Sequence, residues 1–211
     1  MKPAFENRRA AGERLAALLA RYKGSDATVL AIPAGGVPVA AAIAGALHLP
    51  IKVAPVSKVL LPWTTESGYG AVAFDGSVWI DQAALDGYGL KPEQVEKAIA
   101  DARAKVERRR KRFQAWTALE DLGGKTIILV DDGIAAGSTM RTAIAALRKQ
   151  GVNGIVVAVP TAHERSLEVL RKLADEVVCA DIRGGGRFAV ADAYEEWYDV
   201  SDDEVEAMLK R

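Results

Sequence analysis

The sequence has few of the features that mark secreted or membrane proteins. Only one of its 211 residues is cysteine, so no internal disulfide can form, and a reducing compartment fits best. No apolar run approaches the ~20 residues that span a bilayer, and the amino-terminal stretch is too charged for a signal peptide. We therefore expect a cytoplasmic protein in which Cys179 is a core residue.

The sequence also has no formal net charge and only two histidines. Lysine plus arginine and aspartate plus glutamate each number 28, which gives a formal charge of zero. No global field would attract nucleic acid or an anionic membrane, and we expect neither as a partner. His48 and His163 lack metal-ligand spacing and are interpreted as surface or capping residues. Half of the residues are hydrophobic, which is enough for a sizeable core.

Short apolar runs alternate with helical patterns along the chain. The runs predict strands at 28–32, 51–56, 127–130, 154–159 and 176–180, with helices at 37–47, 139–150 and 163–174. This alternation predicts an α/β fold with an open, mostly parallel five-stranded sheet and helices on both faces. If the strand order is 2-1-3-4-5, the loops after Ile32 and Val130 flank one switch point, where such sheets bind ligands.

Residues about 60–120 form an insertion that the sheet does not need, within a single domain over 1–211. Asp75 and Gly76 predict a tight hairpin with a two-residue turn. An apolar stripe from Pro92 towards Trp116 predicts a long helix, whose basic run at 108–112 is interpreted as a solvated end matched to the helix dipole. The insertion also offers a face for a homodimer.

The strongest functional signal lies at 126–142, where an apolar strand runs into an acidic pair and a small, glycine-bearing loop. Small residues leave room for a ligand against the backbone, and hydroxyl residues can cap the next helix. Unpaired N–H groups at that helix start suit a phosphate. Carboxylates accept hydrogen bonds from ribose hydroxyls and can hold a metal through water. The candidate binding residues are Asp131, Asp132, Gly133, Ala135, Ala136, Gly137, Ser138 and Thr139.

This order of residues resembles the ribose-phosphate signature of the type I phosphoribosyltransferases. The resemblance implies transfer of the phosphoribosyl group of phosphoribosyl pyrophosphate (PRPP) to a nucleobase or other nitrogen acceptor, with release of pyrophosphate. It implies that Asp131 and Asp132 hold the ribose hydroxyls, while the 5-phosphate binds the backbone of 135–139 and the hydroxyls of Ser138 and Thr139. It also implies that Mg²⁺ enters with PRPP and touches the acidic pair at most through water.

A second glycine-bearing turn, formed by Ala34, Gly35 and Gly36, follows the first predicted strand. The enzymes that the chain resembles bind pyrophosphate there through backbone amides. A subgroup of unknown acceptor, which the chain resembles over nearly its whole length, commonly has Pro-Arg-Gly-Gly at this place. Here Ala34 replaces the arginine, so the backbone suffices, another cation substitutes, or pyrophosphate affinity falls. The expected substitutes are, in order, Lys58 and then Arg183 or Arg187.

The resemblance also assigns proton transfer and acceptor binding. The loop at 60–70 occupies the place of the mobile catalytic loop, which makes Glu66 a candidate base. Lys58, the expected substitute cation, is the other candidate catalytic residue. Residues about 181–211 occupy the place of the hood over the acceptor. Phe188 there could stack on an aromatic acceptor, although hood aromatics also form small cores. Purine-salvage members carry an aspartate where this chain has Ala135, which weakens a hypoxanthine or guanine assignment.

Two functions stay open. One is the transferase, and the other is a regulatory protein without catalysis that binds PRPP or a nucleotide and has lost its pyrophosphate contacts. Lys58 and Glu66 favour turnover. A receiver-type phosphoacceptor would need acidic residues after the first strand, and a dinucleotide oxidoreductase would need Gly-x-Gly-x-x-Gly; the loop at 33–36 provides neither.

Overall fold

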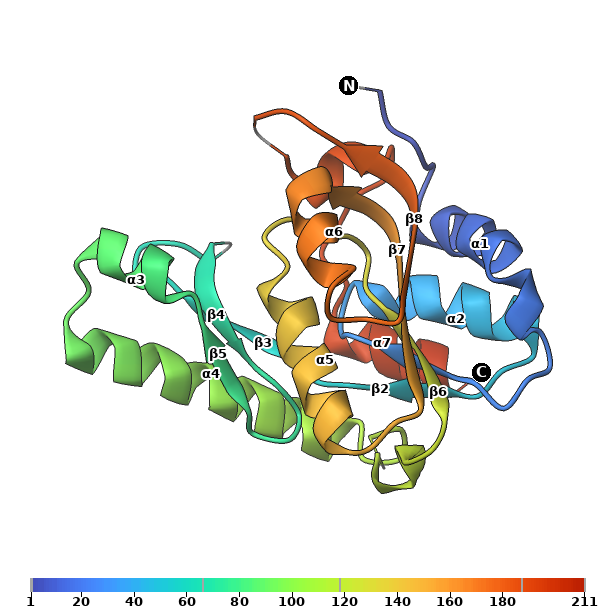
Figure 1. Cartoon of the computed structure of the whole chain (residues 1–211), viewed down its shortest axis with the longest axis horizontal. Helices are drawn as coiled ribbons and strands as arrows, with labels where there is room; N and C mark the ends of the chain where they lie inside the picture. Colours follow the sequence, from blue (N-terminus) through green and yellow to red (C-terminus); the bar gives the residue numbers. More distant parts are fainter. Residues whose placement is uncertain (1, 66, 118, 187, 211) are drawn as a thin grey trace.

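A computed structural model describes residues 2–65, 67–117, 119–186 and 188–210. A five-stranded parallel sheet lies at its centre, with the order β2-β1-β6-β7-β8 (Figure 1). The strands are β1 (Thr28–Ala31), β2 (Ile51–Val53), β6 (Thr126–Val130), β7 (Gly154–His163) and β8 (Glu176–Arg183). This arrangement confirms the predicted α/β class, and its strand order meets the condition 2-1-3-4-5 under which the two loops flank one switch point. Strand β2 is shorter than predicted, because Pro55 has no N–H to extend the ladder.

Helices cover both faces of this sheet. The bounds are α1 (Arg8–Leu18), α2 (Gly36–Leu47), α5 (Ser138–Lys149), α6 (Glu164–Leu170) and α7 (Asp202–Leu209), with short 3₁₀ turns at η1 (Ala20–Tyr22), η2 (Glu120–Leu122) and η3 (Val190–Ala193). Alternate residues of β6 enter two cores: Ile127 and Leu129 meet α5 and α6, whereas Ile128 and Val130 meet α1, α2 and α7. The uninterrupted apolar run of β6 is therefore explained by burial on both faces.

The predicted helix over 163–174 ends earlier, at Leu170. Tight turns then carry the chain to Asp175, whose backbone N–H donates to the carbonyl of Ile155 at 2.9 Å. The return to the sheet therefore ends the helix, although the apolar pattern continues beyond it.

The insertion builds a second, antiparallel sheet in the order β3-β4-β5, beside the main one (Figure 1). Its elements are β3 (Ser57–Leu60), β4 (Gly68–Val72), β5 (Val78–Ile80), α3 (Gln82–Tyr88) and α4 (Pro92–Arg112). The predicted hairpin exists, but three residues separate Ala73 from Ser77, whose backbones hydrogen-bond. Gly76 takes the positive φ of 81°, which is the usual place of glycine in a three-residue hairpin loop.

The basic end of α4 is exposed at four of its five residues over 108–112, as predicted, and its charge matches the helix dipole. Two of its arginines also pair with another helix, which the sequence did not predict. Arg109 is only 13% exposed and pairs with Asp202 at the start of α7, while Arg112 pairs with Asp203 and Glu206 of the same helix. Phe113, which ends α4, is fully buried in the main core. The insertion is therefore tied to the carboxyl-terminal helix by charge pairs and by packing.

None of the helices in the described part of the chain combines the length and apolar composition that a bilayer crossing requires.

Candidate functional site

The acidic pair lies at the carboxyl end of β6, in the middle of the main sheet. The backbone N–H of Asp132 donates to Oδ1 of Asp131 at 2.9 Å. Burial, followed by the charge of Asp132, raises the pKa of Asp131 well above its usual value. Burial also raises the pKa of Asp132, against the opposing charge of Arg8. Two crowded carboxylates of this kind gain from hydrogen-bond donors or from a nearby cation.

The turn formed by Ala34, Gly35 and Gly36 packs directly against this pair. A Cβ atom on Gly35 would lie 1.9 Å from Oδ2 of Asp132, and one on Gly36 would lie 2.9 Å from the Cα atom of Asp131. The Pro33–Ala34 peptide bond is cis, and Ala34 is partly buried. The structure thus brings the two predicted loops together at one point, and glycine is needed for this close approach.

The loop after β6 leads into α5 by way of Gly137, which has a φ of 80°. We expected Ser138 and Thr139 to cap the helix, but they are its first two residues. The residue before the helix is Gly137, which has no side chain to cap it. The first N–H groups of α5 therefore have neither an intrahelical acceptor nor a cap from Gly137, which suits an external anion.

The other small residues of this loop divide into two groups. Ala135 and Ala136 are exposed, and the hydroxyl of Ser166 donates to the carbonyl of Ala135. Gly133 faces the hood instead, because a Cβ atom there would lie 2.4 Å from a methyl group of Val190. Packing against the hood therefore explains the glycine at position 133.

Arg8 is a site residue that the sequence reasoning missed. Its Nε donates to Oδ2 of Asp132 at 2.9 Å, and its Nη1 donates to the carbonyl of Tyr198 at 2.9 Å. The guanidinium lies 3.8 Å from the ring centroid of Trp197, and the side chain is 5% exposed. One signal could have indicated it: two arginines, Arg8 and Arg9, begin α1, where positive charge opposes the helix dipole.

The hood reaches the acidic pair through a second contact. The hydroxyl of Tyr194 donates to the backbone carbonyl of Asp132 at 2.6 Å, and burial together with the Asp132 charge raises the pKa of Tyr194. Its ring centroid is 5.3 Å from that of Trp197 and 5.7 Å from that of Phe5. Tyr194 therefore packs with Phe5 of the amino-terminal segment in a small core beside the acidic pair, with the more exposed Trp197 against its ring. Phe188 lies apart from this core, with its ring centroid 6.2 Å from that of His163.

The structure places two of the predicted catalytic residues and substitute cations, Lys58 and Arg183, in different surroundings. Lys58 is exposed on β3, and its charge contributes to lowering the pKa of both aspartates, so it lies within electrostatic reach of the pair. Arg183 is buried and bonds to Asp181 and to the carbonyls of Asp192 and Lys2. It is a structural residue and not a substitute for the missing arginine. The predictions for Glu66 and Arg187 fall outside the described residues.

Three residues that the sequence analysis did not assign to the site, His48, His163 and Cys179, have ordinary structural roles. His163 caps α6 by accepting from the N–H of Arg165, and His48 ends α2 with a φ of 56°. Cys179 is partly buried against the main core, and burial raises the pKa of its thiol to about 11. A thiol in that state is a poor nucleophile at neutral pH, which agrees with the prediction of a core residue.

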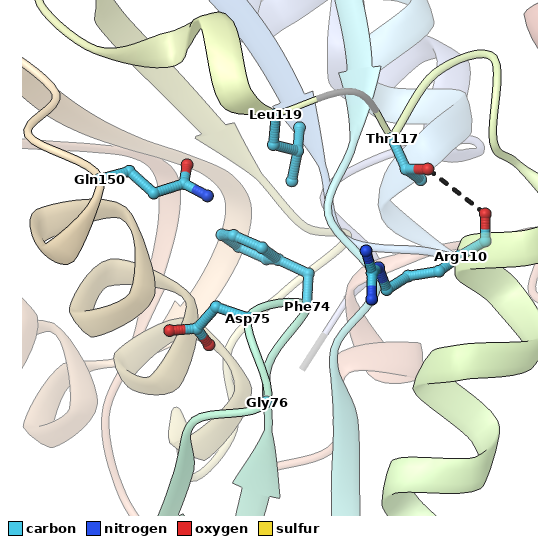
Figure 2. A pocket seen from close by; sticks show the side chains of 7 residues that line it. All are labelled: Phe74, Asp75, Gly76, Arg110, Thr117, Leu119 and Gln150. Carbon is cyan, nitrogen blue, oxygen red and sulfur yellow. Dashed lines mark hydrogen bonds between the residues drawn. The ribbon is translucent and has the colours of Figure 1, made fainter.

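A cavity of about 340 Å³ lies away from the acidic pair. Figure 2 shows its lining of Phe74, Asp75, Gly76, Arg110, Thr117, Leu119 and Gln150. Gln150 follows the carboxyl end of α5, whereas the loop after β6 leads into the amino end of that helix. A helix of this length spans about 18 Å, so the cavity is separate from the predicted ligand site.

Comparisons with known proteins agree with this geometry. The family model of the phosphoribosyl transferase domain matches residues 4–193. A protein of Mycobacterium tuberculosis, provisionally named a phosphoribosyl transferase, is 34% identical over 207 residues, which are 98% of this chain and 46% of that protein. The chain therefore spans about half the length of this relative.

Two solved structures extend the comparison. The crystal structure of the protein TT1426 from Thermus thermophilus has 33% identity, a TM-score of 0.76 and coverage of 99% of this chain and 98% of its own. The protein AQ2163 of Aquifex aeolicus has 10% identity and a TM-score of 0.53, with coverage of 96% and 84% respectively. The second similarity concerns the fold alone.

Proposed function

The chain belongs to the phosphoribosyl transferase domain family, and we propose that it transfers the phosphoribosyl group of PRPP to a nitrogen acceptor with release of pyrophosphate. One observation carries the proposal: the turn at Gly35 and Gly36 touches Asp131 and Asp132 at the end of β6. The carboxylate pair and the turn proposed to bind pyrophosphate therefore meet at one point. We propose that the reaction takes place in the cytoplasm.

Each part of the site would handle one part of PRPP. The ribose hydroxyls would donate to Asp131 and Asp132, whose crowded charges gain from such donors. The N–H groups at the start of α5 would bind the 5-phosphate, and the backbone of Ala34 to Gly36 would bind the pyrophosphate. Arg8 and Tyr194 would keep Asp132 in place while the sugar binds.

The site also fits Mg²⁺ in a role supported by few protein ligands. Within the described ranges, His, Cys, Asp and Glu form no group of three or more that could enclose a metal ion. Magnesium commonly keeps waters and binds substrate phosphates together with one or two carboxylates. When bound with PRPP, it would neutralise charge on the departing pyrophosphate. The preorganised amides at 34–36 would stabilise the same charge.

Calorimetry with PRPP and Mg²⁺ tests the proposed ribose contacts. The double variant Asp131→Asn plus Asp132→Asn should bind PRPP at least about tenfold more weakly, because a hydrogen bond to a charged group is worth roughly 1.5–3 kcal/mol. Asp101→Asn is the control, since Asp101 is an exposed residue that pairs with Lys97 on α4. Equal affinities for the parent and the double variant would remove the acidic pair from the binding site.

A regulatory protein that binds PRPP without turnover is the second candidate, because Ala34 leaves the pyrophosphate loop without the arginine seen in similar sequences. A panel of nucleobases and other amines, assayed for pyrophosphate release, separates the two. Release with any acceptor supports the transferase. Binding of PRPP without release of pyrophosphate in the presence of any acceptor of the panel supports the regulatory protein.

A further inference from the structure

Helix α4 brings basic side chains to the pyrophosphate loop from the insertion. Nη1 of Arg109 donates to the backbone carbonyl of Pro33 at 2.8 Å. Lys105 lies one helical turn before Arg109, so the two side chains share a face of α4. The helix packs on β3, the strand that carries Lys58. Two elements of the insertion thus place cations beside the turn that contains Ala34.

The two α4 residues differ in what they can offer a ligand. Arg109 is committed, because it holds Pro33 and pairs with Asp202 at 2.8 Å. It keeps the loop in place. Lys105 is an exposed residue, so its ammonium can turn towards an anion that binds at the loop.

The surroundings of Lys105 are rich in positive charge. Partial desolvation, the charge of Arg109 and, to a smaller extent, those of Arg108 and Lys58 lower the pKa of Lys105, while Asp202 opposes them. Asp202 already pairs with Arg109. A group of neighbouring cations attracts an anion from solution, because the anion relieves their repulsion.

We propose that Lys105 of the insertion helix binds the pyrophosphate group and, with Lys58, supplies the positive charge that the loop lacks at Ala34. The inference rests on the proposed function and adds to it a ligand residue from outside the sheet. Lysine suits this role because it binds phosphate as a point charge and needs no fixed bidentate geometry.

Calorimetry with magnesium pyrophosphate tests the role of Lys105. Lys105→Met should lower the affinity about tenfold, which corresponds to loss of one charged contact. Lys111→Met is the matched control: Lys111 lies on the same helix, is 78% exposed and pairs with Glu107. The control should stay within about twofold of the parent, and adding Ala34→Arg to Lys105→Met should restore much of the affinity.

Ribose 5-phosphate locates the effect, because its phosphate would bind at α5 and not at the α4 side. Its affinity should be the same for the parent and Lys105→Met. An equal loss for both ligands, or unchanged pyrophosphate binding in Lys105→Met, would overturn the assignment of Lys105. Failure of the parent to bind either PRPP or pyrophosphate would instead overturn the proposed function itself.

Discussion

Arg8 illustrates how one side chain joins distant parts of the chain. It lies on α1, pairs with Asp132 after β6 and stacks on Trp197 of the hood. These partners are 124 and 189 positions away. A buried ion pair of this kind specifies how segments meet more than it adds net stability, but removal of one partner is costly because the other stays buried and charged.

Replacement of Arg8 by Met should therefore destabilise the protein by about 3 kcal/mol, the usual cost of leaving a buried charge unpaired. Urea unfolding measures this change. Arg9→Met serves as the control, because Arg9 is 83% exposed and surface pairs contribute about 0–1 kcal/mol. Adding Asp132→Asn to Arg8→Met should recover part of the loss. Equal unfolding midpoints for the two arginine variants would contradict this role of Arg8.

At the scale of elements, the start of α2 is shaped by the space it must share with β6. Gly35 precedes the helix with a φ of −60°, a conformation open to any residue. Its requirement for glycine comes from the neighbouring carboxylate and not from the backbone angle. Gly45 lies in the same helix, yet a Cβ atom there would meet nothing within 4 Å.

Substitution by alanine should therefore impair ligand binding at Gly35 and stabilise the fold at Gly45. Gly35→Ala would displace the Asp132 carboxylate from Arg8 and should lower PRPP affinity at least about tenfold, because a charged hydrogen bond to the ligand is lost. Gly45→Ala should stabilise the protein by about 0.5–1 kcal/mol, the usual gain for alanine inside a helix. Calorimetry and thermal unfolding measure the two effects. Unchanged PRPP binding in Gly35→Ala would contradict this prediction, because it would show that displacement of the Asp132 carboxylate does not affect ligand affinity.

For the molecule as a whole, the acidic pair links stability to pH. Burial raises the pKa of both aspartates in the folded state, so the folded protein binds these protons more tightly than the unfolded chain. Their contribution is fully present below the unfolded pKa of about 3.9 and is lost as pH rises through the folded values. The site therefore costs the protein stability at neutral pH.

Replacing Asp131 by Asn should remove much of that cost. The amide can still accept from the N–H of Asp132, and it has no charge to bury. We expect the thermal midpoint at pH 8 to rise by at least ~2 °C, which corresponds to about 1 kcal/mol in a chain of this length. The difference should shrink as the pH falls towards 4, because protonation of Asp131 in the parent removes the charge that is costly to bury. A difference that is constant between pH 4 and pH 8 would argue against burial as its cause.

Local patterns were sufficient for the main sheet and for much of the site. The branched run at Ile127 to Val130 predicts a buried strand because only such a strand is apolar on both faces. The acidic pair and the small residues after it follow from the same stretch. Local patterns failed where the chain had to meet something distant: the helix after His163 stops when Asp175 bonds the sheet, and Arg109 and Arg112 of α4 pair with α7.

The sequence by itself determined the α/β class and the two loops that form the candidate site, because periodicity and glycine placement act over a few residues. The strand order was only assumed from the sequence, and the structure supplied it. Only the tertiary structure decided which charges reach those loops. Arg8 and Arg109 find Asp132 and Pro33 across 124 and 76 positions, and no local pattern specifies a partner at that separation. Such pairs form because packing of α1, α4 and α7 around the sheet removes water from the arginine side chains. Each guanidinium must then bind a carboxylate or carbonyl oxygen of the protein.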